Sequence, residues 1–133
     1  MEKREIFICF AIGGVVYPIL EIFWRGYTHF SMAMLGGVCF ALIYFINGKF
    51  RHCKATFRAF LCACVISALE FFCGVVVNIF LRLDVWDYSR EVFNLYGQIC
   101  LSYCILWYFL SLLCCPVCYF LKKLFIKWRK EKA

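Results

Sequence analysis

The sequence is poor in the groups that hold metals and nucleotides. It has only two histidines, His29 and His52, which lie in different connections between apolar runs, and it has no glycine-rich phosphate loop or Walker motif. Most of its eleven cysteines lie inside or beside apolar runs, whereas a disulfide framework spaces its cysteines through polar loops. We therefore expect no metal, no cofactor and no disulfide scaffold, and cysteines that act as small packing residues.

Charged residues are also scarce, at 17% of the chain, while 65% of its 133 residues are hydrophobic and the mean hydropathy is +0.82. A soluble domain of this length cannot hide so much apolar surface, because small domains leave a large part of their surface in water. A lipid environment removes the difficulty. The composition therefore predicts one integral membrane domain that covers residues 1–133.

Four apolar runs are long enough, or nearly so, to cross a hydrocarbon core about 30 Å thick. They cover residues of about 6–24, 31–47, 59–83 and 93–120, and a basic tail follows at 121–133. We therefore predict an all-α polytopic membrane protein with four transmembrane helices. Leu20–Gly26 resembles Leu69–Gly74, so the two helical hairpins are candidates for a parallel repeat.

The formal charge of +7 is unevenly placed along the chain. If both termini lie in the cytoplasm, the inner flanks hold twelve Lys and Arg residues and the outer connections hold only Arg25, Arg82 and Arg90. Cytoplasmic flanks of membrane proteins carry such an excess of positive charge. We therefore predict that both termini are cytoplasmic and that the basic flanks contact membrane lipids, not nucleic acid.

Glu70 is the sharpest functional signal, because it lies deep inside the third apolar run. A charged carboxylate at mid-bilayer costs at least ~2.5 kcal/mol, so Glu70 must face protein or water, be protonated, or have a partner. One interpretation is a carboxylate that binds a proton, a cation or a substrate. The other is a structural residue that holds helices together by hydrogen bonds. Asn78 lies on the same helical stripe, two turns further on.

Glu21 and Arg25 are four residues apart, with the acid nearer the N-terminus, which is the favourable order for an ion pair within a helix. A structural pair at the outer membrane boundary is the simpler reading. If Arg25 instead points into a cavity, it could hold an anionic group of a substrate.

A polar segment follows the third run and contains Trp86, Asp87 and Tyr88. Trp and Tyr favour the membrane interface, and Asp87, followed by Ser89, could cap a short helix that runs into Asn94. That explanation does not cover the amides that come next. We predict an outward-facing polar pocket with Glu70 as its floor, formed by Glu21, Arg25, Glu70, Asn78, Trp86, Asp87, Tyr88, Asn94 and Gln98.

Five motifs occur in order along the chain: Gly-Gly-x-x-Tyr-x-x-x-Glu-x-x-Trp-Arg-Gly at 13–26, Ser-Met followed by Gly-Gly at 31–37, Leu-Glu-Phe-x-x-Gly at 69–74, Trp-Asp-Tyr-Ser at 86–89 and Asn-x-x-Gly-Gln-Ile at 94–99. In this combination the chain resembles the Putative ABC-transporter type IV family of small bacterial integral membrane proteins, over roughly residues 13–107. The resemblance implies a multi-helix protein of the bacterial cytoplasmic membrane with a role in transport. Any coupling to ATP would then need a separate ATPase subunit.

Together these observations favour a small transporter or permease-like protein for a small molecule or an ion. Four helices barely enclose a path for a solute, so we also expect a homodimer, with candidate contacts within or between protomers at Gly13, Gly14, Gly36 and Gly37. Two alternatives stay open. One is a membrane scaffold whose polar residues pair only with each other; the other is an intramembrane lipid-acting enzyme with Glu70 or Asp87 as general base.

Overall fold

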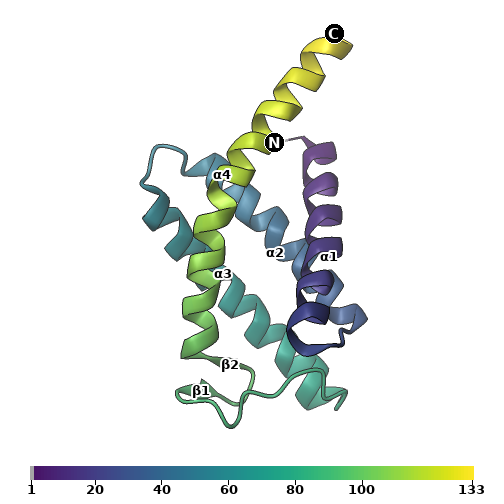
Figure 1. Ribbon diagram of the computed structural model, residues 1–133, viewed down its shortest axis with the longest axis vertical. Coiled ribbons are helices and arrows are strands. Elements are labelled where there is room, and N and C mark those ends of the chain that lie inside the picture. Colours follow the sequence, from purple (N-terminus) through teal and green to yellow (C-terminus); the bar gives the residue numbers. More distant parts are fainter. Residues whose placement is uncertain (1) are drawn as a thin grey trace.

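The computed structural model describes residues 2–133 and shows a bundle of long helices (Figure 1). These are α1 (Lys3–Arg25), α2 (Phe30–Lys49), α3 (Ala55–Gly74), which continues as the π-helix η1 (Val75–Phe80), and α4 (Leu101–Lys132). In the described part of the chain, four helical segments are long and apolar enough to cross a membrane. The prediction of an all-α protein with four membrane-spanning helices is confirmed.

The connection between α1 and α2 is short because both helix ends have their own local signals. Gly26 follows α1 with a φ of 81°, which glycine adopts easily, and its N–H donates to the carbonyl oxygen of Ile22. At the start of α2, the Nδ1 atom of His29 accepts a hydrogen bond from the N–H of Ser31 at 3.1 Å. The two helices are therefore antiparallel neighbours.

Glycines let α1 and α2 approach each other closely. A Cβ atom at Gly13 would collide with the carbonyl oxygen of Gly36, and one at Gly37 would lie 2.8 Å from Cε2 of Phe10. Small residues serve this purpose in membrane helices, where packing replaces the hydrophobic effect as the driving force. These glycines were expected to form contacts either within one protomer or between two. In the structure, Gly13, Gly36 and Gly37 form contacts within one chain.

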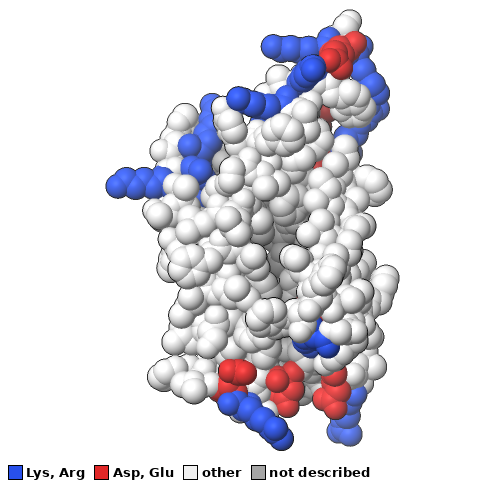
Figure 2. Space-filling model, in the orientation of Figure 1, with Lys and Arg blue, Asp and Glu red and all other residues white. Residues whose placement is uncertain are grey.

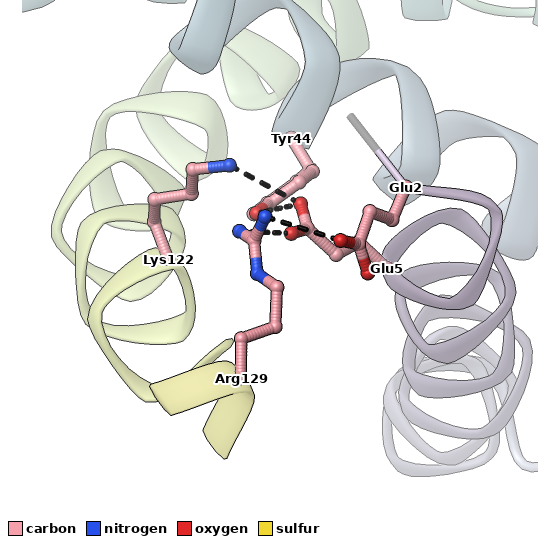
Figure 3. Close-up of polar contacts among 5 residues, drawn as sticks. All are labelled: Glu2, Glu5, Tyr44, Lys122 and Arg129. Carbon is pink, nitrogen blue, oxygen red and sulfur yellow. Dashed lines mark hydrogen bonds and ion pairs between the residues drawn. The ribbon is translucent and has the colours of Figure 1, made fainter. Parts of the chain in front are cut away.

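The remaining packing follows the order of the chain: α2 packs against α3, and α3 packs along α4. Helix α1 is tied to α4 at its two ends. At one end Glu5 accepts hydrogen bonds from Lys122 and Arg129 (Figure 3). At the other end Nε1 of Trp24 donates to the hydroxyl of Tyr103 at 3.1 Å.

The segment before α4 differs from the expectation of a helix that begins near residue 93. Residues 81–100 form an irregular loop with a two-stranded antiparallel hairpin of β1 (Asn94–Leu95) and β2 (Ile99–Cys100), and α4 begins only at Leu101. Gly97, at a φ of 72°, supplies the turn, and Asn94 accepts a hydrogen bond from its N–H. At the other end α4 extends to Lys132, so the basic tail is helical.

Lys and Arg side chains gather at the end of the bundle that holds both termini and the α2–α3 connection (Figure 2). The opposite end, which holds the 81–100 loop, carries a mixture of acidic and basic side chains. This distribution fits the predicted orientation with both termini in the cytoplasm.

Candidate functional site around Glu70

Glu70 lies on α3 with its side chain enclosed by the bundle, and only 2% of the residue is exposed. Its Oε1 atom accepts a hydrogen bond from the hydroxyl of Tyr88 at 3.0 Å, and Oε2 accepts one from Nε1 of Trp107 at 3.0 Å. Among residues 2–133, no Lys, Arg or His forms an ion pair with it. The carboxyl group is therefore held by two neutral donors and keeps the capacity to accept a cation or a proton.

Tyr88 brings the 81–100 loop onto Glu70. Its ring stacks on that of Tyr103 from α4, with the centroids 4.7 Å apart and the planes at 16°. Burial, and the nearby Glu70 carboxyl group, raise the pKa of the Tyr88 phenol well above its usual value. Tyr88 therefore stays protonated and remains a hydrogen-bond donor to Glu70 at any physiological pH.

A second set of hydrogen bonds holds the loop against the end of α3 and η1. Asn78 accepts from the N–H of Val85 at 2.8 Å and donates through Nδ2 to Oε1 of Gln98 at 2.8 Å. Nε1 of Trp86 donates to the carbonyl oxygen of Gln98 at 3.0 Å. Gly74 leaves space for this cluster, since a Cβ there would lie 3.0 Å from both Cβ of Gln98 and Cζ2 of Trp86. The amides predicted to line a pocket thus bond to each other and to the loop backbone.

Arg25 connects the same loop to α1. Its Nε atom lies 2.6 Å from Oε2 of Glu21, and its Nη1 atom donates to the carbonyl oxygen of Val85 at 2.9 Å. The guanidinium group also lies over the ring of Tyr27, 4.7 Å from the centroid. Its third nitrogen, Nη2, is buried and has no hydrogen-bond partner among the described residues.

Two of the predicted pocket residues are exposed and shape turns away from Glu70. Asp87 accepts hydrogen bonds from the N–H and the hydroxyl of Ser89, at 2.9 and 3.0 Å. Asn94 donates to the carbonyl oxygens of Ser89 and Glu91. Asp87 therefore caps a turn and not the short helix that the sequence suggested, and among the described residues no hydrogen bond joins either side chain to Glu70.

A cavity of about 270 Å³ lies beside Glu70, with residues of α1, α2, α3 and α4 in its lining. Figure 2 shows the molecule hollowed between α4 and α1. The hollow lies between the two sets of hydrogen bonds that join the ends of α1 to α4. We refer to this cavity as the lateral cleft. The sequence predicted a polar pocket that faces outwards, whereas the lateral cleft is apolar apart from side-chain groups of Tyr17, Glu70, Trp107 and Ser111.

Ser111 is the polar residue of the lateral cleft that sequence reasoning missed. It is fully buried, and its hydroxyl has no hydrogen-bond partner among residues 2–133. Ser111 and Trp107 are one helical turn apart on α4, so the pair shares a face. This spacing inside an apolar run was the one signal in the sequence that could have identified them.

Comparison with models of protein families matches residues 6–132 to the one described as Putative ABC-transporter type IV. The chain belongs to this family. Comparisons with curated proteins and with solved structures find no match. The family match extends beyond the motifs at residues 13–107 and includes all of α4, so the cysteine-rich and basic C-terminal part belongs to the family domain as well.

This member of the ABC-transporter type IV family is thus an integral membrane protein whose one buried carboxyl group at mid-helix lies beside an apolar cleft. Within residues 2–133 no three His, Cys, Asp or Glu side chains lie together as metal ligands would. The polar groups next to the cleft are the carboxyl oxygens of Glu70, which can accept hydrogen bonds, and the hydroxyl of Ser111, which can donate or accept one.

Proposed function

We propose that this protein is the membrane-spanning part of a transporter and that its substrate enters the lateral cleft from the bilayer, between α1 and α4. The observation that carries the proposal is the combination of an apolar cleft with a buried carboxyl group and an unpartnered hydroxyl in its lining. Membership of an ABC-transporter-type family supports a role in transport. Since the chain has no nucleotide-binding motif, a separate ATPase subunit would supply the energy.

The chemistry of the lining indicates what kind of substrate would fit. An apolar wall favours a compound with an apolar body, because binding then buries apolar surface without stranding polar groups. Glu70 already accepts two neutral hydrogen bonds and has no cationic partner. We therefore propose a small amphipathic molecule that carries a positive charge or a hydrogen-bond donor, which would lie against Glu70 and Ser111.

In this proposal, the outer loop is the cover of the site. Tyr88 would have to release Glu70 before a bound molecule could leave outwards, and the bonds of Arg25 and Asn78 to the loop backbone would set how readily the loop moves. Glu21, Trp86 and Gln98 would act in the same cover, while Asp87 and Asn94 would hold its turns. We also propose a parallel homodimer, since four helices enclose little space for a path.

Tetraphenylphosphonium, a cation with an apolar surface, provides a test with the purified full-length protein. We expect it to quench tryptophan fluorescence or raise the Tm, because Trp107 lines the cleft and the cation would lie near Glu70. Tetraphenylborate has nearly the same shape and the opposite charge, so it should bind at least about tenfold more weakly.

Glu70→Gln should abolish the preference for the cation, and Glu91→Gln is the matched control, because Glu91 is exposed and the change in charge is the same. Circular dichroism and the Tm without ligand would show that both variants fold. Equal binding of the cation by the original protein and by folded Glu70→Gln would contradict the proposal.

A membrane scaffold is the second candidate, because Asn78, Gln98 and Trp86 satisfy each other without a ligand. It predicts that neither probe binds, whatever residue 70 is. An enzymatic role has less support, since the two groups bonded to Glu70 are a phenol and an indole and not a nitrogen base.

A further inference from the structure

A second cavity, of about 830 Å³, lies between the α2–α3 connection and α4. We call it the basic cavity. It is at the end of the bundle where Lys and Arg gather (Figure 2), and on α4 its lining begins at Cys115, one turn beyond Ser111 of the lateral cleft. Six residues with basic side chains line it: Lys49, Arg51, His52, Arg58, Lys122 and Lys123.

The positive charges of the basic cavity are largely unneutralised. Among the described residues that line it, none is Asp or Glu. Arg58 donates to Oδ1 of Asn47 at 3.0 Å and to the carbonyl oxygen of Cys53, and both of these acceptors are uncharged. Lys123 lies 4.6 Å from the ring centroid of Tyr119 and is exposed. Such a concentration of like charge around a hollow is unfavourable unless an anion reduces it.

Lys122 is the one lining residue with an acidic partner, and that partner is shared. Figure 3 shows Glu5 between the side chains of Lys122, Arg129 and Tyr44. The distances to the Glu5 oxygens are 3.3 Å from Nζ of Lys122, 2.8 Å from Nη2 of Arg129 and 2.7 Å from the Tyr44 hydroxyl. Glu5 thus divides its charge between two cations, and the side chain of Lys122, 44% exposed, keeps N–H groups for another acceptor.

The same cluster makes the wall of the basic cavity rigid. Glu5 is 2% exposed and connects α1 to Tyr44 of α2 and to Lys122 of α4, and both of these partners line the cavity. The α2–α3 connection on the other wall is held by the hydrogen bonds of Arg58. The positions of Lys122 and Arg58 are therefore set before any ligand arrives, which lowers the entropy cost of binding one.

We propose that the basic cavity binds a phosphate group with two or more negative charges, carried by the headgroup of an anionic membrane lipid. Arg and Lys side chains that converge from different elements are suited to phosphate oxygens: Arg51 supplies a forked donor, and Arg58, whose Nε and Nη1 atoms bond to the protein, supplies Nη2. Basic pockets between membrane helices at the cytoplasmic surface bind such headgroups. The apolar lining residues Phe45, Tyr119 and Ile126 provide a surface along which acyl chains would lie.

This site is independent of the proposed transport function, because it shares no residue with the lateral cleft. Bound lipid would connect α2, α3 and α4 at the cytoplasmic surface, and should therefore stabilise the bundle. A soluble phosphate compound carries the same charged group without acyl chains. An experiment can therefore distinguish a site for a lipid headgroup from a site for free phosphate.

The test uses the purified full-length protein in a neutral detergent. Short-chain phosphatidic acid, short-chain phosphatidylcholine and inorganic pyrophosphate would each be titrated, with the Tm and native mass spectrometry as readouts. We expect phosphatidic acid to raise the Tm and to remain bound in the mass spectrum, and phosphatidylcholine to do neither. Stabilisation by pyrophosphate as well would support the phosphate site and identify the phosphate group as sufficient. No stabilisation by either phosphate compound would overturn the proposal.

A pair of double variants separates the cavity from general attraction to positive charge. Arg51→Gln with Lys123→Gln removes two exposed charges of the cavity, and Lys130→Gln with Lys132→Gln removes two exposed charges of the same protein end that do not line it. We expect the first pair to weaken the binding of phosphatidic acid about tenfold or more and the second pair to change it less than about threefold. Equal loss in the two double variants, at unchanged Tm without lipid, would overturn the site.

Discussion

Glu70 combines two properties that conflict in most proteins: it is ionisable and it is almost completely buried. An unsatisfied carboxylate in this position would cost far more than the bundle could tolerate, so its two neutral hydrogen bonds are necessary to its presence. They come from Tyr88 in the 81–100 loop and Trp107 in α4, and both elements are therefore coupled to the state of one carboxyl group. A ligand or proton at Glu70 would change the strength of both bonds.

Tyr88→Phe tests this coupling directly. The variant keeps the ring that stacks on Tyr103 but removes the donor to Glu70, so we expect the free energy of unfolding to fall by about 1–3 kcal/mol. Tyr96→Phe is the matched control, because Tyr96 lies in the same loop and is 77% exposed. Denaturant or thermal unfolding of the purified proteins in one detergent would measure both. A Tyr88→Phe variant as stable as Tyr96→Phe would show that the hydrogen bond does not hold the loop.

At the scale of residues, the sequence indicated Glu70 because it is a lone carboxylate in an apolar run. It could not indicate Trp107, which is 37 residues away, because pairing between distant helices depends on their relative rotation. The one-turn spacing of Ser111 from Trp107 was a signal in the sequence, but it does not show which way this face of α4 is turned. Asp87 and Asn94 form hydrogen bonds within turns, and the sequence alone could not show this because short polar side chains in a loop satisfy turns as readily as they line pockets.

Close packing of α1 on α2 is the main property of the bundle at the scale of elements. At Gly36 a Cβ atom would collide with Cβ of Tyr17 and lie 2.8 Å from the carbonyl oxygen of Gly13. Neither atom is the flexible end of a side chain, so the two helices would have to separate. The position of α1 decides the width of the lateral cleft, because α1 forms one of its walls.

Gly36→Ala should therefore destabilise the protein by about 1–3 kcal/mol through overpacking. Gly48→Ala, in the same helix, should instead stabilise the protein. Nothing lies within 4 Å of the added Cβ, and alanine favours a helix over glycine by up to about 1 kcal/mol. The Tm of each variant, compared with that of the original protein, measures its change in stability. A neutral or stabilising Gly36→Ala would contradict the close approach of α1 and α2.

The four membrane helices could be predicted because lengths of apolar sequence follow directly from the thickness of the bilayer. The start of α4 could not. Residues 93–100 are as apolar as a helix requires, and only Asn94 and Gly97 mark the hairpin turn that replaces it. Composition therefore identifies which segments enter the membrane. It does not distinguish a transmembrane helix from an apolar loop that packs against the end of a helix.

The whole molecule is polarised along its long axis. Both termini and the α2–α3 connection share the basic end, whereas the other end holds the 81–100 loop and the cover of Glu70 (Figures 1 and 2). Cytoplasmic flanks retain Lys and Arg during insertion, so this asymmetry predicts that the basic cavity faces the cytoplasm and the loop faces outwards. The lateral cleft lies between these two surfaces.

Fusions to alkaline phosphatase, which is active only outside the cytoplasm, test this orientation in bacterial cells. A fusion after Gly97 should be active, whereas fusions after His52 and after Ala133 should be inactive, with a difference of about tenfold or more. Green fluorescent protein at the same positions should give the reverse pattern, because it becomes fluorescent in the cytoplasm, and it controls for expression. Similar phosphatase activity at all three positions would contradict a single orientation, and the basic cavity and the 81–100 loop could not then be assigned to opposite faces of the membrane.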